Sequence, residues 1–263
     1  MKNGEMSLTL ITNGNERAFH SAIGDCFAEK QEDDLFIGVV DEKGAAAAAG
    51  AFREENGVLQ LLRIASDEGH RGKGYVYFLM EEMKKRARAA GLSEIGTYLF
   101  AREEDGEGEW MAWLKRQGFE IAHLPAKRYG ISLAALYEKQ PFAGRRLRKG
   151  EKIRFLKNQK YGFELVKETS VRATLLAEDF HGDIYLSLVD AEPGYFSDVK
   201  LLIDEALLNV REKAPDAKLL YMDINSYRLM DYVERSLKNR GLEIEEELSA
   251  LYAAFAMEED SDE

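Results

Sequence analysis

A strand, a glycine-rich turn and a helix follow one another in one segment, which constrains the fold more than any other part of the chain. Residues 58–65 are almost continuously apolar, as is typical of a buried strand. Residues 69–74 then read GHRGKG, three glycines with two basic residues among them. From Tyr75 to Ala90 apolar residues recur at helical spacing, and Gly91 follows where a helix favours glycine at its end.

This turn predicts a phosphate-binding site, because the first N–H groups of a helix lack intrahelical acceptors and carry a partial positive charge. Glycine lets the backbone approach a phosphate closely. The turn is not a P-loop, because Lys73 is followed by Gly74 and not by Ser or Thr. It is not a dinucleotide fingerprint, because Tyr77 stands where the last glycine of that motif belongs.

The turn resembles the acyl-CoA signature [QR]-x-x-G-x-[GA] of the GCN5-related N-acetyltransferase (GNAT) superfamily. Arg71 takes the first position and Gly74 the required glycine, whereas Val76 takes a last position that is normally small. The resemblance implies acetyl-CoA, or another acyl-CoA, as the bound cofactor. The residues that it implies as cofactor-binding are Ile64, Ala65, Ser66, Arg71, Gly72, Lys73, Gly74, Tyr75 and Val76.

Length and charge exclude several other classes of protein. A chain of 263 residues is long for one domain and comfortable for two. Without a long apolar run or a leader-like start, we expect a cytoplasmic protein with no membrane partner. Cys26 is the only cysteine, so we expect no disulfide and no metal site built on thiolates. A net charge of −12 disfavours nucleic acid as a partner.

The periodicity of the first half predicts the element order β-α-β-β-β-α-β-α-β-β, which is the order that the GNAT resemblance implies. The expected strands are residues 7–12, 35–40, 45–52, 58–65, 95–100, 119–123 and 129–136, and the expected helices are residues 18–27, 75–90 and 109–117.

The second half repeats the first at a displacement of about 123 positions, which indicates duplicated units. We therefore predict an α/β (α+β) protein with two tandem GNAT-like domains, residues 1–140 and 141–263, each a mixed, mostly antiparallel sheet flanked by helices. Residues 193–198 replace the phosphate turn and contain no basic residue. Asp198 stands at the helix start, where it is expected to cap the helix and repel a pyrophosphate. The second domain is therefore expected not to bind the cofactor.

The catalytic side chains are less clearly defined. Many GNAT relatives place a proton-donating tyrosine four residues before a Gly-Phe pair, but Leu114 stands at that position here. Tyr98 and Tyr129 are the candidates that could replace it as the acid, and Glu109 and Glu120 are candidate bases that would act through water.

Three functions remain open from the sequence. The first is an N-acetyltransferase that acts on a primary amine of a small molecule or a peptide. The second is a non-catalytic acyl-CoA-binding or sensor protein, which the missing tyrosine and the altered second domain suggest. The third is a tRNA-dependent aminoacyl transferase, because tandem GNAT-like folds also occur in that class. The second domain has two expected roles, shaping the acceptor pocket or forming a homodimer contact.

Overall fold

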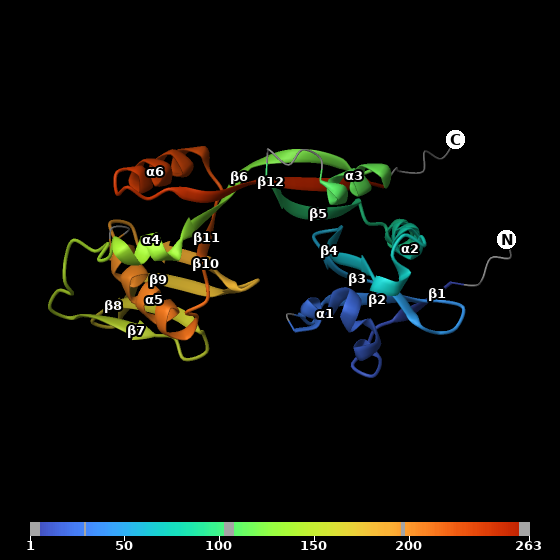
Figure 1. The fold of residues 1–263 in the computed structure, drawn as a ribbon, viewed down its shortest axis with the longest axis horizontal. Coiled ribbons are helices and arrows are strands. Elements are labelled where there is room, and N and C mark those ends of the chain that lie inside the picture. The colour runs from blue at the N-terminus through green and yellow to red at the C-terminus, as the bar shows by residue number, and fades with distance from the viewer. Residues whose placement is uncertain (1–5, 29, 103–107, 196–197, 258–263) are drawn as a thin grey trace. The chain divides into compact units, whose positions relative to one another are not determined.

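The computed structural model describes residues 6–28, 30–102, 108–195 and 198–257 (Figure 1). The chain forms two compact units. Unit 1 comprises Met1–Leu99, Asp105–His123 and Leu251–Glu263, and unit 2 comprises Phe100–Glu104 and Leu124–Ala250. Within the described ranges, no helix is both long and apolar enough to cross a bilayer.

Unit 1 is a sheet with helices on both faces. Its strands lie in the order β1-β2-β3-β4-β5-β12. The elements are β1 (Ser7–Leu10), α1 (His20–Ala28), β2 (Asp34–Val40), β3 (Ala46–Glu55), β4 (Val58–Ser66), α2 (Tyr75–Ala89), β5 (Glu94–Ala101) and α3 (Glu109–Arg116), together with the end of β12 (Ile244–Ala256). The strand over the alanine run at residue 46 is confirmed, although alanine favours helices by propensity.

Alternation of side chains along the strands separates two cores in unit 1. Phe52 of β3 packs in one core with Leu79 of α2 and Leu114 of α3. Ala51, the residue before Phe52, packs in the other core with Ile23 of α1. Successive residues of a strand point to opposite faces of its sheet. Helices α2 and α3 therefore cover one face and α1 covers the other.

From residue 151 onward, unit 2 repeats the strand order of unit 1, but among its described residues no helix lies between the first two of these strands, where unit 1 has α1. Its strands lie in the order β12-β6-β11-β10-β9-β8-β7. The elements are β6 (Glu120–Ser132), α4 (Leu133–Glu138), β7 (Glu151–Phe155), β8 (Tyr161–Lys167), β9 (Ser170–Phe180), β10 (Asp183–Ala191), α5 (Val199–Lys213), β11 (Leu219–Ile224), α6 (Tyr227–Lys238) and the first part of β12. In unit 1 the order is β4, α2 and β5, and in unit 2 it is β10, α5 and β11, as expected for a duplication.

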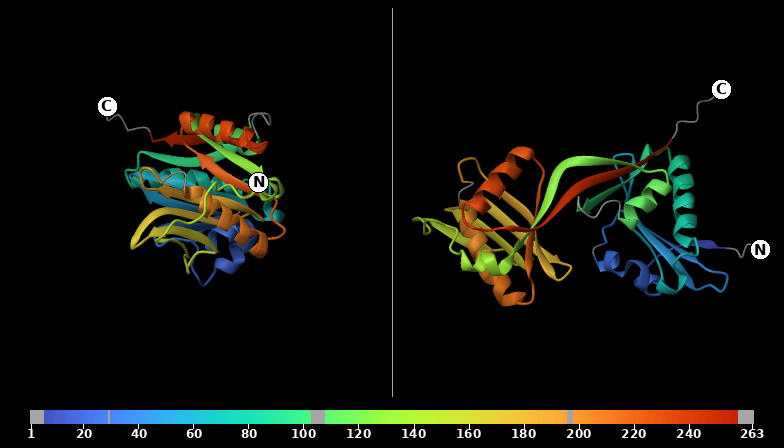
Figure 2. Two further views of the ribbon diagram at one scale, coloured as in Figure 1. Left: turned by 90° about the vertical axis from the view of Figure 1, so that its left-hand side faces the viewer. Right: turned by 45° about the horizontal axis from the view of Figure 1, so that its top comes forward.

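Two long strands contribute residues to both units (Figure 2). Strand β6 belongs to unit 1 as far as His123, and strand β12 belongs to unit 1 from Leu251 onward. The sheet of unit 1 therefore includes the C-terminal end of the described chain. The two units do not follow a single division of the chain at residue 140. Strand β12 comes from the second half of the sequence, but it lies between β5 and β6 and so contributes to both units.

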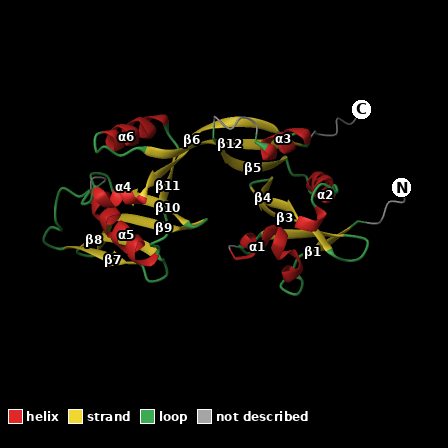
Figure 3. Cartoon of the chain, in the orientation of Figure 1, coloured by secondary structure: helices red, strands yellow, loops and turns green. Residues whose placement is uncertain are grey.

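The predicted pair of strands at residues 119–123 and 129–136 is wrong. Glu120–Ser132 forms one strand (Figure 3). Pro125 cannot donate a backbone hydrogen bond, but it precedes Lys127, the first residue of β6 that pairs with β11, so the strand tolerates it. Ser132 then starts α4, because its hydroxyl accepts a hydrogen bond from the backbone N of Ala135 at 3.3 Å.

Candidate active site

The cleft of unit 1 begins where β4 and β5 stop pairing. The two strands are parallel and pair only from Val58 to Gln60 on β4 and from Glu94 to Gly96 on β5. The register of β3 against β4 shifts at the next residues, where Phe52 pairs with Leu61 and Ala51 pairs with Arg63. Leu62 is thus an unpaired bulge residue, which bends β4 away from β5.

Beyond the bulge, β4 ends in the predicted cofactor segment Ile64, Ala65 and Ser66. Ile64 is buried, and Ala65 and Ser66 are half-buried. Their backbone leads directly into the glycine-rich turn, so the open side of the cleft and the turn are adjacent along the chain. This geometry suits a ligand whose chain lies along β4 and whose phosphates reach the start of α2.

Asp67 fixes the start of the turn. Its carboxylate accepts hydrogen bonds from the Ser21 hydroxyl at 2.6 Å and from the Gly69 backbone N at 3.0 Å. These two bonds, together with His70, lower the pKa of Asp67. The ring of His70 lies between Asp67 and Asp41, with nitrogen to oxygen distances of 3.4 and 3.3 Å. His70 therefore anchors the turn to the β2–β3 connection, and its ring meets the edge of the Tyr75 ring.

The turn presents open backbone at the start of α2. Gly72 and Gly74 have φ angles of 74° and 86°, a conformation that favours glycine, and a Cβ on either residue would meet no atom within 4 Å. In the described structure no side chain caps the first N–H groups of α2. Arg71 and Lys73 are exposed, and the Lys73 ammonium donates to the Gly69 carbonyl oxygen at 2.7 Å.

These features fit a pyrophosphate. The N–H groups of Gly74, Tyr75 and Val76 are available at a helix N-terminus, and the adjoining space is open. Two exposed cations lie within the same turn. The assignment of individual cofactor contacts stays a prediction, since it rests on the sequence pattern and on this fit.

Tyr98 is the candidate acid that lies at the cleft of unit 1. It is on β5, two residues beyond the last residue paired with β4, and 65% of its side chain is exposed. Ile95 and Leu99 pack in the core against α2 and α3, so alternation places Tyr98 on the α1 face of the sheet.

Tyr252 is a neighbour of Tyr98 that the sequence did not reveal. It comes from the C-terminal strand β12, and its ring centroid is 4.8 Å from that of Tyr98. Its hydroxyl donates to Oε1 of Glu94 at 2.5 Å. Burial, followed by this hydrogen bond, raises the pKa of Tyr252 to about 12. No local signal could have found this pair, because more than half of the chain separates its members.

The other catalytic candidates are not gathered around Tyr98. Glu109 begins α3 and Glu120 begins β6, and both are exposed, without a hydrogen bond to Tyr98 among the described residues. Tyr129 belongs to unit 2, where it is fully buried and its hydroxyl donates to Glu234 at 2.5 Å. Burial, and then this carboxylate, raise the pKa of Tyr129, so it holds its proton tightly. Leu114 is also fully buried, in the core of unit 1.

Unit 2 places different residues at the corresponding position. The fifth residue of β11 is Asp223, as Tyr98 is the fifth residue of β5. Arg128 donates to Asp223 at 2.6 and 2.9 Å, and the Tyr185 hydroxyl donates to it at 3.0 Å. Burial, and then the Asp223 carboxylate, raise the pKa of Tyr185 to about 12. This ion pair occupies the place of the tyrosine pair in unit 1.

The predicted capping role of Asp198 is wrong. Its side chain makes no cap hydrogen bond to α5. It is buried and accepts instead from the Arg145 guanidinium at 2.9 Å, while Arg145 also donates to Glu151 at 2.7 Å. The Asp198 carboxylate pairs with Arg145 and does not cap the helix, because the guanidinium is charged and presents several N–H donors in a planar arrangement.

Comparison with known proteins relates the first part of the chain to one family. Residues 9–119 match the model of the acetyltransferase (GNAT) family. No curated protein sequence matches this chain significantly. Among solved structures, a tandem GNAT protein from the clavulanic acid biosynthesis pathway is 11% identical, covers 97% of this chain and all of its own, and superposes with a TM-score of 0.70.

Two further solved structures have the same fold. A GCN5-related N-acetyltransferase from Sphaerobacter thermophilus is 11% identical, with 99% of this chain and 98% of that chain covered and a TM-score of 0.55. One from Kribbella flavida is 13% identical, with 94% and 70% covered and a TM-score of 0.52. Residues 9–119 therefore belong to the GNAT family, and the chain has a tandem GNAT fold, as predicted.

Proposed function

We propose that unit 1 transfers an acetyl group from acetyl-CoA to a primary amine of a small molecule or a peptide. The observation that carries this proposal is the open glycine turn at the end of a strand that diverges from its neighbour. Such a cleft separates the two substrates, with the acyl donor on the turn and the amine at the divergence. A cytoplasmic location is part of the same proposal.

The reaction needs a neutral amine, a donor for the developing oxyanion and a proton for the departing thiolate. The amine nitrogen forms a bond to the acyl carbon while the carbon–sulfur bond breaks. The Tyr98 hydroxyl is the proposed proton donor to the thiolate sulfur, and Tyr252 positions its ring. The proton lost from the amine passes through water, and the exposed carboxylate of Glu120 is the proposed base. Glu109 does not fit this role, because it begins α3, on the face of the sheet opposite Tyr98.

Binding is tested by the shift that acetyl-CoA causes in the melting temperature. Acetyl-CoA at 100 times its Kd is expected to stabilise the protein by about 2.7 kcal/mol. Gly74→Asp should remove the shift, because a carboxylate would then meet the pyrophosphate. Gly194→Asp is a matched control, since Gly194 also has a positive φ, of 88°, and open space around it. No shift with the unaltered protein would refute the proposal.

A non-catalytic acyl-CoA-binding role is the second candidate. Leu114, buried where many relatives carry a catalytic tyrosine, favours it. The two functions differ in product. Release of CoA thiol in the presence of a panel of primary amines identifies an acyltransferase, whereas a melting shift without thiol release over the whole panel identifies a binding protein.

A further inference from the structure

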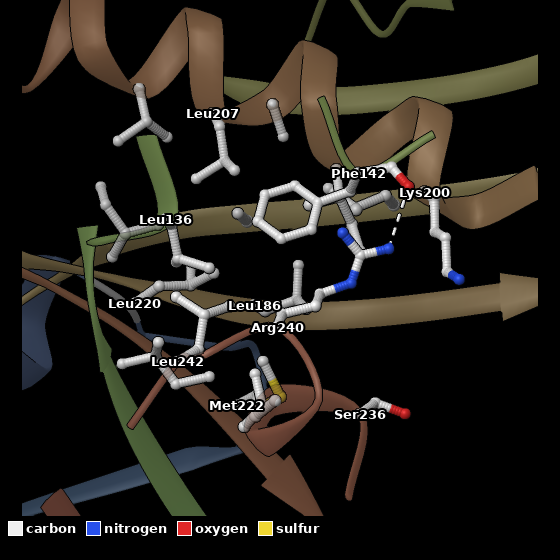
Figure 4. Close-up of a pocket in the computed structure, with 18 residues that line it drawn as sticks. Leu136, Phe142, Leu186, Lys200, Leu207, Leu220, Met222, Ser236, Arg240 and Leu242 are labelled. Atoms are coloured by element: carbon white, nitrogen blue, oxygen red, sulfur yellow. Dashed lines mark hydrogen bonds between the residues drawn. The ribbon is translucent and has the colours of Figure 1, made fainter. Parts of the chain in front are cut away.

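Unit 2 contains a cavity of about 150 Å³ between α5 and the sheet (Figure 4). Its walls come from β6, β9, β10 and β11 on one side and from α4, α5 and α6 on the other. Most of the lining is aliphatic or aromatic, including Leu136, Phe142, Leu207, Leu220, Met222 and Leu242. An apolar cavity of roughly this size stays dry and admits a benzene-sized group.

Three residues of the lining carry polar groups at the ends of their side chains. Lys200 and Ser236 lie across the cavity from Leu136, Leu220 and Leu242, and the Arg240 guanidinium lies beside the Phe142 ring (Figure 4). The surface of the cavity itself is almost wholly apolar, so the charged groups of Lys200 and Arg240 border the cavity and do not form its wall. A ligand that fits it carries a compact apolar group and an anionic group at opposite ends.

Several basic residues of unit 2 are neutralised by carboxylates, and within the described ranges the two cations at this site are not. Arg145, Arg154 and Lys160 each pair with a carboxylate. Among the described residues, Lys200 and Arg240 pair with none. Within the described part of the chain, Arg240 donates only to the Phe142 carbonyl oxygen, at 3.2 Å, and its guanidinium lies 5.0 Å from the Phe142 ring centroid.

The remaining donors of Arg240 are therefore available to a ligand, since a guanidinium carries five N–H groups. Lys200 is the second residue of α5, where the helix dipole adds to its charge. The nearest acidic residue in sequence, Asp198, is held by Arg145, so it does not neutralise this border of the cavity.

A second hollow, of about 520 Å³, continues from the cavity. It lies where β10 and β11 diverge, because these parallel strands pair only from Ile184 to Leu186 and from Leu220 to Met222. Lys200, Ser236 and Leu237 line both spaces, so Lys200 lies where the cavity adjoins the wider hollow.

We propose that unit 2 binds a compact apolar carboxylate, with its alkyl or aryl group in the cavity and its carboxylate at Lys200 and Arg240. The cavity volume limits the apolar group to about the size of benzene. The unpaired cations select an anion over an alcohol or an amine of the same shape. This site is separate from the acetyl-CoA turn of unit 1, and the proposal does not depend on acetyl transfer.

Calorimetric titration of the full chain with hexanoate and phenylacetate tests the proposal. Both acids are expected to bind. Hexan-1-ol should bind roughly tenfold more weakly than hexanoate because it lacks the negative charge, and hexylamine should not bind. Lys200→Gln should weaken hexanoate roughly 5- to 30-fold, because an ionic hydrogen bond is lost. Lys238→Gln, an equal charge change on the exposed face of α6, should leave hexanoate affinity unchanged.

The apolar part of the site is tested on α5. Ala206 lines the cavity and is 6% exposed, whereas Leu208 is 56% exposed on the same helix. Ala206→Phe fills the cavity and should abolish binding, while Leu208→Phe should not alter it. If Ala206→Phe does not fold, the Lys200→Gln comparison decides alone. Equal binding of hexanoate and hexan-1-ol, equal effects of Lys200→Gln and Lys238→Gln, or no binding of either acid would each overturn the proposal.

Discussion

Gly96→Ala is expected to destabilise unit 1 through the C-terminal strand. A Cβ on Gly96 would lie 1.9 Å from the Tyr252 hydroxyl oxygen and 2.6 Å from the ring carbon that carries it. The ring must move, and its hydrogen bond to Glu94 is then lost. Overpacking costs about 1–3 kcal/mol, and loss of a hydrogen bond to a charged group costs a similar amount. Since Tyr252 is only half-buried, we expect a total loss of about 2–4 kcal/mol.

Tryptophan fluorescence during thermal unfolding measures this effect in unit 1 alone, because both tryptophans, Trp110 and Trp113, lie in α3. The expected fall in Tm is roughly 6–12 °C. In a Tyr252→Ala background the same substitution should cost less than about 1 kcal/mol, since the clash has been removed.

Gly14→Ala serves as the control for the loss of a glycine. A Cβ on Gly14 would be 3.6 Å from the Thr12 hydroxyl, an ordinary contact, so its cost should stay under about 0.5 kcal/mol. An equal cost of Gly96→Ala with and without the Tyr252 ring would refute the placement of this strand beside β5.

Three further outcomes are expected. Tyr98→Phe should lower kcat roughly 10²-fold with little change in the KM for acetyl-CoA, as measured by thiol release, and an unchanged kcat would exclude Tyr98 as the acid. The pKa of Tyr252, about 12, is above the ordinary value near 10 of the unfolded chain. The stability that this difference contributes is complete below pH 10 and is lost as the pH rises toward 12, so Tyr252→Phe should flatten the alkaline loss of stability followed by tryptophan fluorescence. Leu114→Tyr should destabilise unit 1 by about 1–3 kcal/mol without raising kcat, because residue 114 is enclosed in the core; a gain in rate would contradict this.

The parts of this protein that the sequence predicts are local. The apolar strand, the glycine turn and the helix from Tyr75 follow from neighbouring residues, and the duplicated order follows from repetition along the chain. The end of β6 was mispredicted, because the alanines and leucines after Ser132 fit a strand or a helix, and the Ser132 cap decides for the helix.

The pairing of strands across the duplicated chain could not be predicted. Both β6 and β12 alternate polar and apolar residues at the equivalent place of their repeats, so periodicity does not say which of them lies beside β5. The structure places β12 there and brings Tyr252 to Tyr98. The cavity of unit 2 could not be predicted from the sequence either, because a gap between leucines depends on how the side chains pack and not on the spacing of apolar residues.

The position of β12 in unit 1 has a consequence for synthesis of the chain. Unit 1 begins with the first described residues, yet its sheet includes residues from Leu251 onward. A growing chain therefore emerges from the ribosome with β5 unpaired on one side for as long as the whole of unit 2 is being translated. An exposed strand edge of this kind is prone to aggregate, so chaperone dependence during translation is expected to be greatest just before β12 is released.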